Sequence, residues 1–151
     1  MATAPKLRSG KTLGLTISVH QENLFPLHSG GMDMRGGGAG EGFNLNIPLP
    51  PGSGYGAYEA TFDRVVIPAL EAFVPELIIV SSGFDAGIHE PLGRQLMHSR
   101  GYRELTGKLM HTADKVCDSR LMMCHEGGYD GSTVPYMGLA VLEELSVHCK
   151  S

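Results

Sequence analysis

Two residues of this sequence, Asp85 and Tyr129, are placed where an α/β protein could use them for chemistry. Asp85 stands two residues past Gly83, which follows the apolar run 77–80, and in open α/β sheets ligands bind beyond such strand ends. Tyr129 follows two glycines after a second apolar run, where its phenol could donate a hydrogen bond to an oxyanion. Two simpler interpretations stay open: Asp85 caps a turn, and Tyr129 packs at a helix start with its hydroxyl on the surface.

The seven histidines do not by themselves indicate a metal site, because the sequence has no HxH, HExxH or His/Cys ligand spacing. His20 ends a predicted strand and His125 precedes the glycine pair, so these are the two histidines that we expect to face a cleft. A serine nucleophile is not favoured, since there is no GxSxG motif.

The elements that position these residues can be predicted from apolar periodicity. Short apolar runs predict strands over residues 13–19, 42–47, 77–81 and 121–124. Apolar residues at three- and four-residue spacing predict helices over 58–73, 99–118 and 134–145. We expect Ser99 to cap the second helix and the stretch 48–54 (PLPPGSG) to stop the second strand. We expect Pro68 to kink the first helix or cost it a hydrogen bond.

The order of strands and helices favours right-handed crossovers, and therefore a mainly parallel sheet in a three-layer α/β/α fold. The runs 77–80 and 121–124 have the composition of strands that are covered on both faces. The loops after Ser81 and Cys124 would then open on the same edge of the sheet.

The stretch 21–42 contains seven glycines and almost no apolar pattern, which predicts a long loop anchored by Phe25 and Pro26. Loops of this length in compact domains are usually functional or disordered. The glycines form neither a GxGxxG nor a Walker motif, so phosphate binding is not favoured.

Length and composition favour one domain or part of one, since the chain has 151 residues, 42% of them hydrophobic. A net charge of -4 with scattered Lys and Arg gives no electrostatic reason to expect nucleic-acid or membrane binding. Three cysteines without a CxxC pair indicate reduced thiols. With no signal-peptide pattern, the expected location is intracellular, in the cytoplasm, with the nucleus left open.

Six motifs, in this order, resemble those of the zinc-dependent histone deacetylases. They are Leu15–Gln21, Phe25-Pro26, Gly40–Gly52, Ser82–Ala86 (SGFDA), Glu90–Gly93 (EPLG) and Glu126–Tyr129 (EGGY). The resemblance is strongest to the class II-like bacterial histone deacetylase-like amidohydrolases and covers about residues 12 to 146. It implies the arginase/deacetylase-like fold, and it corresponds to the C-terminal half of the family's catalytic domain.

The activity that this resemblance implies is zinc-assisted hydrolysis of an N-acetylated lysine or a related acylated amine. Asp85 matches a zinc-binding aspartate of the family. Tyr129 matches the tyrosine that stabilises the tetrahedral oxyanion.

The resemblance also implies roles for residues around these two. Phe25 matches an aromatic wall of the acyl-lysine tunnel, Leu92 a pocket residue, and Gly128 lies in the matching substrate-binding loop. A structural monovalent-cation site of the family, with potassium as the candidate cation, matches the Ser18 side chain and the Val19 carbonyl.

Two family motifs have no match in this sequence. The other zinc ligands lie on an Asp-x-His motif and the general base on a His-His pair, both upstream of the segment that matches Leu13. A catalytic zinc takes three protein ligands, so Asp85 alone leaves the predicted site two ligands short. The continuation Leu27–Gly30 also differs from the family's usual glycine-rich one.

Three interpretations follow. In the first, residues 1–11 are an unstructured leader, 12–147 the C-terminal half of a deacetylase-like domain, and 148–151 a tail, and the isolated chain is inactive. In the second, the chain is a non-catalytic α/β interaction module derived from that family. In the third, which we favour least, it is a small hydrolase that uses Asp85, His125 and Tyr129 in another arrangement. The sequence does not indicate the acyl group, the amine or the oligomeric state.

Overall fold

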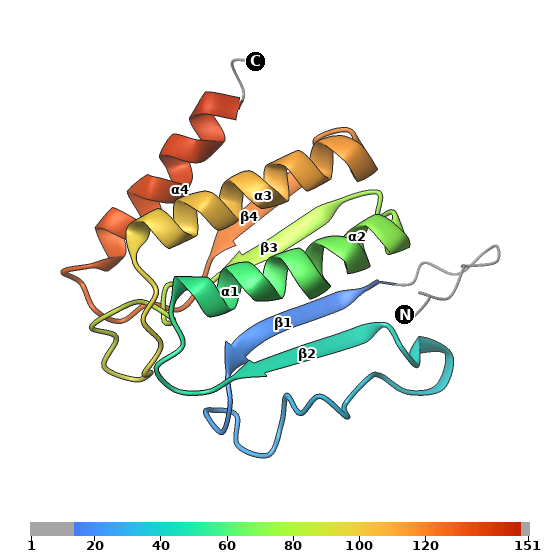
Figure 1. Cartoon of the computed structure of the whole chain (residues 1–151), viewed down its shortest axis with the longest axis horizontal. Helices are drawn as coiled ribbons and strands as arrows, with labels where there is room; N and C mark the ends of the chain where they lie inside the picture. Colours follow the sequence, from blue (N-terminus) through green and yellow to red (C-terminus); the bar gives the residue numbers. More distant parts are fainter. Residues whose placement is uncertain (1–13, 149–151) are drawn as a thin grey trace.

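The structure, a computed structural model, describes residues 14–148 of the chain (Figure 1). Its strands are β1 (Thr16–Gln21), β2 (Asn44–Leu49), β3 (Ile78–Ser82) and β4 (Leu121–His125). Its α-helices are α1 (Tyr55–Thr61), α2 (Ile67–Phe73), α3 (Ser99–Cys117) and α4 (Val134–His148), and a 3-10 turn spans Gly38–Gly40. The predicted strand start at Leu13, the leader 1–11 and the tail residues 149–151 lie outside the described residues.

The described strands form two parallel pairs, β1 with β2 and β3 with β4, and not the single sheet that we expected. β1 and β3 are the inner strands in Figure 1, with β2 and β4 outside them. β2 ends within the stretch 48–54 as predicted, but it continues through Pro48 and ends at Leu49, two residues later than expected. A proline is tolerated there because β2 is an edge strand, whose missing N–H faces away from β1.

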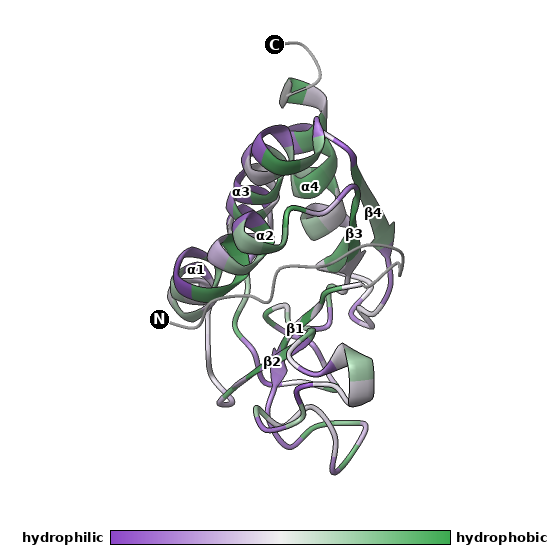
Figure 2. Ribbon diagram, turned by 90° about the vertical axis from the view of Figure 1, so that its right-hand side faces the viewer, coloured by the Kyte–Doolittle hydropathy of each residue, from purple (hydrophilic) through white to green (hydrophobic). Residues whose placement is uncertain are grey.

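The helices lie on one side of the strands, as Figure 2 shows. The expectation that 77–80 and 121–124 are covered on both faces is therefore wrong for the described residues. Ile78 is buried against this helical layer, whereas Ile79 is 59% exposed and Met122 is 48% exposed. The alternation of strand side chains turns these two toward the uncovered face.

The first helical segment runs without a break through α1, a π-helical turn at Phe62–Val66, and α2. Pro68 has no N–H to donate, and the π turn lies just before it, with the Ile67 N–H bonded to the Phe62 carbonyl. The segment ends at Phe73, where Val74 adopts a left-handed conformation (φ 54°) ahead of Pro75. Pro68 therefore alters the helix without ending it.

α3, the predicted helix of 99–118, is the central helix of the layer and buries Leu105, Leu109 and Ala113. Its cap differs from the prediction: His98, not Ser99, is the N-cap, and His98 Nδ1 accepts the Gly101 N–H at 3.1 Å. Among residues 14–148 we find no helix with the length and apolarity that crossing a bilayer requires.

Candidate functional site

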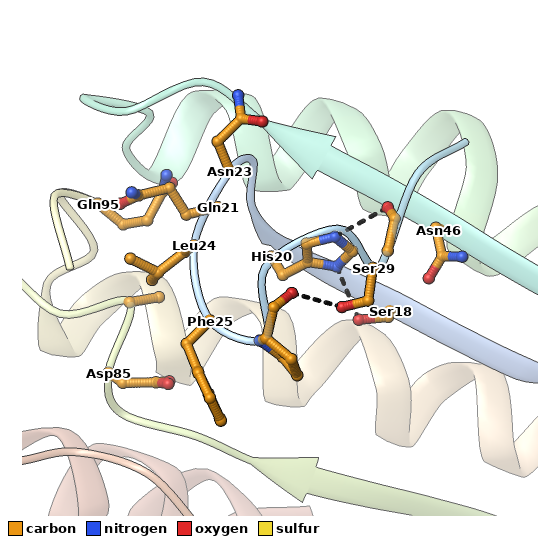
Figure 3. Close-up of a pocket in the computed structure, with 13 residues that line it drawn as sticks. Ser18, His20, Gln21, Asn23, Leu24, Phe25, Ser29, Asn46, Asp85 and Gln95 are labelled. Atoms are coloured by element: carbon orange, nitrogen blue, oxygen red, sulfur yellow. Dashed lines mark hydrogen bonds between the residues drawn. The ribbon is translucent and has the colours of Figure 1, made fainter. Parts of the chain in front are cut away.

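A cavity of about 360 Å³ opens at the carboxyl ends of β1 and β3 (Figure 3). One wall is the end of β1 and the loop that follows it, with Ser18, His20 and Phe25 among its residues. Asp85, on the loop after β3, lies across the cavity from His20 and Ser18. Parallel strands thus bring residues from distant parts of the chain to one edge, as the sequence predicted.

His20 is held in one orientation by hydrogen bonds at both ring nitrogens. Nε2 lies 3.1 Å from the Gly30 carbonyl, and Nδ1 lies 2.8 Å from Ser18 Oγ. Because a carbonyl can only accept, Nε2 carries the proton of the neutral ring, and the Ser18 hydroxyl donates to Nδ1. The neutral His20 ring thus has no lone pair left for a metal, while Ser18 Oγ keeps its own lone pairs.

The loop after β1 is also tied to β2 and to the segment that follows Asp85. Asn46 donates to the carbonyls of Gly31 (3.2 Å) and Met34 (2.9 Å). Gln21 is buried, and its Oε1 accepts the Arg94 N–H at 2.7 Å. These bonds give a glycine-rich segment a defined path along the cavity.

Asp85 sits against the glycines of two neighbouring loops. A Cβ on Gly127 would lie 2.9 Å from both Cγ and Oδ2 of Asp85, and one on Gly83 would lie 2.6 Å from its Oδ1. The Phe84 N–H donates to the Gly127 carbonyl at 2.6 Å, which links the loop after β3 to the loop after β4. The Asp85 side chain is exposed, so its carboxylate is available to a ligand.

The Tyr129 loop is anchored by Glu90, a buried carboxylate. Glu90 Oε2 accepts the Tyr129 N–H at 2.9 Å, and its Oε1 accepts the Leu92 N–H at 3.3 Å. Gly128 has a φ of +132°, and a Cβ there would lie 2.8 Å from Phe84 Cβ. The Tyr129 side chain itself is 63% exposed.

The cavity lining brings together three of the predicted site residues, Ser18, Phe25 and Asp85. The others, Val19, Leu92, Gly128 and Tyr129, are not part of it. Val19 lines a neighbouring groove between β1 and β3, together with Ser18 and Asp85. Leu92 and Tyr129 are linked to each other through Glu90, and His125 stacks on Phe84 with ring centroids 5.0 Å apart.

Two tyrosines, the buried Tyr58 and the partly buried Tyr102, lie beneath the Asp85 loop. Burial raises the pKa of both hydroxyls, and the nearby Asp85 carboxylate raises each pKa further. The Ala86 N–H acts in the opposite direction on the pKa of Tyr102, although no hydrogen bond of normal geometry reaches its hydroxyl from the described residues. Both phenols therefore stay protonated at neutral pH.

The described residues do not fit a complete zinc site. Between residues 14 and 148 there is no group of three His, Cys, Asp or Glu side chains that could hold a metal ion. Asp85 offers an accessible carboxylate, but His20 is engaged at both nitrogens. Of the three protein ligands that a catalytic zinc takes, residues 14–148 supply at most one, Asp85.

Sequence reasoning missed the roles of Gln21 and Glu90. Glu90 stood in the EPLG motif, but a charged residue followed by proline is typical of an exposed turn. Its burial and its bond to a residue 39 positions away are tertiary facts. Gln21 likewise contacts a residue 73 positions away. Gln21 stood at the start of the predicted loop 21–42, so no local pattern indicated its burial.

Comparison with known proteins agrees with the fold and the motifs. Residues 11–145 match the histone deacetylase domain. The histone deacetylase-like amidohydrolase of Pseudomonas aeruginosa is 48% identical over 132 residues, which cover 87% of this chain and 35% of that protein.

Two solved structures are similar as well. The histone deacetylase Clr3 superposes with a TM-score of 0.80 at 34% identity, covering 87% of this chain and 22% of Clr3. The acetylpolyamine aminohydrolase of Burkholderia pseudomallei gives a TM-score of 0.75 at 26% identity, covering 86% of this chain and 37% of that one. The chain spans about a third of the length of the curated relatives that it matches at 48% and 36% identity.

The arginase/deacetylase type of fold predicted from the sequence is therefore confirmed, as a partial α/β unit. The domain match spans most of the chain, and it includes the SGFDA, EPLG and EGGY motifs. The chain belongs to the histone deacetylase family.

Proposed function

We propose that this chain supplies part of a zinc-dependent catalytic unit that hydrolyses acylated amines, with acetyl-lysine as the first candidate substrate. The observation that supports this most is the cavity at the strand ends, which joins Phe25 on one wall to the Asp85 carboxylate on the other. An apolar wall beside an accessible carboxylate suits an acylated alkyl amine, whose chain is apolar and whose reacting end is polar.

In this proposal Phe25 contacts the alkyl chain of the substrate and Tyr129 donates a hydrogen bond to the carbonyl oxygen as negative charge develops. Glu90 acts on Tyr129 indirectly, because it holds the backbone of the Tyr129 loop and leaves the phenol free. Asp85 is the proposed zinc ligand, and the remaining ligands would come from outside residues 14–148.

The isolated chain is then expected to be inactive. A single hydrogen-bond donor such as Tyr129 is typically worth about 10²- to 10³-fold in rate. That contribution leaves most of the barrier in place when no group in the described residues generates the nucleophile.

Three further statements stay predictions. Residues 12–147 form the C-terminal half of a deacetylase-like catalytic domain, the protein is intracellular, and Ser18 and Val19 belong to a monovalent-cation site. The lone pairs that Ser18 Oγ retains are compatible with the last of these.

The test combines zinc titration by calorimetry with a fluorogenic acetyl-lysine assay on the full 151-residue chain. We expect no tight zinc binding and no turnover. Micromolar or tighter zinc binding, with turnover lost in both Asp85→Asn and Tyr129→Phe, would mean that histidines of this chain complete the site. The matched control is Asp33→Asn, which removes an exposed carboxylate that lies outside the cavity lining.

A further inference from the structure

The N-terminus of α3 is capped by a residue that can lose its hydrogen-bond acceptor near neutral pH. His98 Nδ1 accepts the Gly101 N–H at 3.1 Å, and the His98 carbonyl accepts the same N–H at 2.9 Å. A ring nitrogen accepts only through its lone pair, so the Nδ1 contact exists only while Nδ1 carries no proton. Histidines change charge between about pH 5 and 8, whereas the usual Ser and Thr caps do not titrate there. His98 is exposed, so protons reach its ring without any opening of the fold.

A second set of partners lies beside the same ring. The ring centroids of His98 and Tyr55 are 6.0 Å apart. The Tyr55 hydroxyl in turn contacts Glu59 Oε1 at 2.7 Å and Glu104 Oε2 at 2.5 Å. A cation is attracted both to an aromatic face and to carboxylates, so these groups suit the protonated ring better than the neutral one.

The charges around this position also favour a cation. Three carboxylates and two cations gather here, namely Glu59 and Asp63 on the first helical segment with Arg100, Glu104 and Lys108 on α3. Hydrogen bonds from Tyr55 and Arg100 lower the pKa of Glu104, and the positive charge of His98 lowers it further. The N-terminal end of a helix repels a cation. A protonated His98 is therefore repelled from the Gly101 N–H and attracted toward Tyr55 and Glu104.

The cap is connected to the Asp85 loop through Met97. Met97 is 1% exposed, its N–H donates to Ala86 O at 3.0 Å, and its carbonyl accepts the Ile88 N–H at 2.7 Å. Ala86 directly follows Asp85. A Cβ on Gly101 would lie 2.9 Å from Met97 Cε, so the first turn of α3 packs closely on Met97. A change in the cap therefore acts on the backbone that holds the Asp85 loop.

The ring contacts of His20 and His111 differ from this one. His20 Nδ1 pairs with the Ser18 hydroxyl, which can either donate or accept, and His111 Nδ1 faces the Gly107 carbonyl at 2.7 Å, which accepts. Both contacts can persist when the ring gains a proton. The partner of His98 is a backbone N–H, which can only donate, so this contact is lost on protonation.

We propose that His98 is a pH-sensitive cap that controls the Asp85 loop. The neutral ring caps α3 and keeps residues 86–88 bonded to Met97. The protonated ring releases the Gly101 N–H, turns toward Tyr55 and Glu104, and loosens the loop that carries Asp85.

The test follows amide hydrogen exchange and NMR spectra of the full chain from about pH 8 to about pH 5, with exchange expressed as protection relative to an unstructured peptide. We expect the protection of the Met97 and Ile88 amides to fall about fivefold as the His98 ring gains its proton, the effect of losing an ordinary N-cap. The Leu109 amide, in the middle of α3, should keep its protection. Protection of Met97 and Ile88 that does not follow His98 protonation would overturn the proposal. An equal loss at Leu109 would overturn it too, because the whole fold would then be opening.

A pair of variants separates the charge from the cap. His98→Thr keeps a side-chain acceptor that does not titrate, so the protection of Met97 and Ile88 should stay constant across this pH range. His98→Ala removes the acceptor, so both amides should be weakly protected at either end of the range. A pH dependence in His98→Thr equal to that of the unaltered chain would show that the proposal is wrong. If His98→Ala does not fold, the Thr variant decides.

The matched control is His28→Asn. It removes an exposed histidine that lies outside the cavity lining, at a φ of +63° that Asn tolerates well, and it should leave the pH dependence unchanged.

The inference rests on the proposed function only for the role of Asp85 as a site residue. Exchange is measured without any substrate, so an acetyl-lysine assay that fails leaves the pH-sensitive cap unaffected. A pH-independent Asp85 loop overturns the cap whatever the chain hydrolyses.

Discussion

Replacing Glu90 tests how the Tyr129 loop is held. Glu90→Ala removes the acceptors of the Tyr129 N–H (2.9 Å) and the Leu92 N–H (3.3 Å). Only the first bond has a normal length, and the exposed loop lets water replace it in part, so we expect a loss of about 1–2 kcal/mol in the free energy of unfolding. For a chain of this size that corresponds to a decrease in Tm of about 2–8 °C.

The decisive assay is amide hydrogen exchange at Tyr129, followed beside urea unfolding. Glu90→Ala should accelerate exchange of this amide more than the global loss of stability requires, because the loop opens locally. Glu90→Gln keeps one carbonyl acceptor and serves as the matched control, with an intermediate effect. Unchanged exchange at Tyr129 in Glu90→Ala would refute the reasoning, since it would mean that the loop is held by other contacts.

Three further predictions follow from single contacts. Gly127→Ala places a Cβ 2.9 Å from the Asp85 carboxylate and should displace that side chain, which NMR shifts of Asp85 would report; unchanged shifts would contradict it. Met97→Ala removes a side chain that is 1% exposed and should cost about 2–5 kcal/mol in urea unfolding, whereas a loss below 1 kcal/mol would show that the core collapses around the gap. Hydrogen bonds from the hydroxyls of Thr133 and Ser132 hold the pKa of Asp130 below its ordinary value. The Asp130 carboxylate therefore stabilises the fold above its unfolded-state pKa, and this stabilisation is lost as the pH falls through its folded-state pKa. An NMR titration in which Thr133→Val leaves the pKa of Asp130 unchanged would contradict this.

The secondary structure could be predicted from the sequence because local composition determines most of it. The β-branched run at Ile78 and Ile79 forms a strand, and apolar spacing in 99–118 forms a helix, as predicted. The sequence could not predict that one face of β3 is exposed, because apolar side chains on both faces do not show which segment covers each face. The cap of α3 was missed since His98 and Ser99 are adjacent and both side chains carry acceptors.

The site was predictable where a residue ends a strand and not where it depends on distant contacts. Asp85 and Phe25 both border the cavity, and each follows a predicted strand. Glu90 and Gln21 act through partners 39 and 73 positions away, which no local pattern encodes. The packing of Tyr129 belongs to this second kind, because its loop position follows from Glu90.

The geometry of the cavity depends on how β1 and β3 are held relative to each other. No ladder of hydrogen bonds joins these two strands in the described residues, so their spacing rests on side-chain packing against Val66 and the rest of one buried cluster. Apolar packing is non-directional, whereas a hydrogen-bonded ladder fixes both distance and register. Ser18 and Phe25 follow the β1 side of the cavity and Asp85 follows the β3 side. The separation of Phe25 and Asp85 across the cavity therefore depends on the packing of this one apolar cluster.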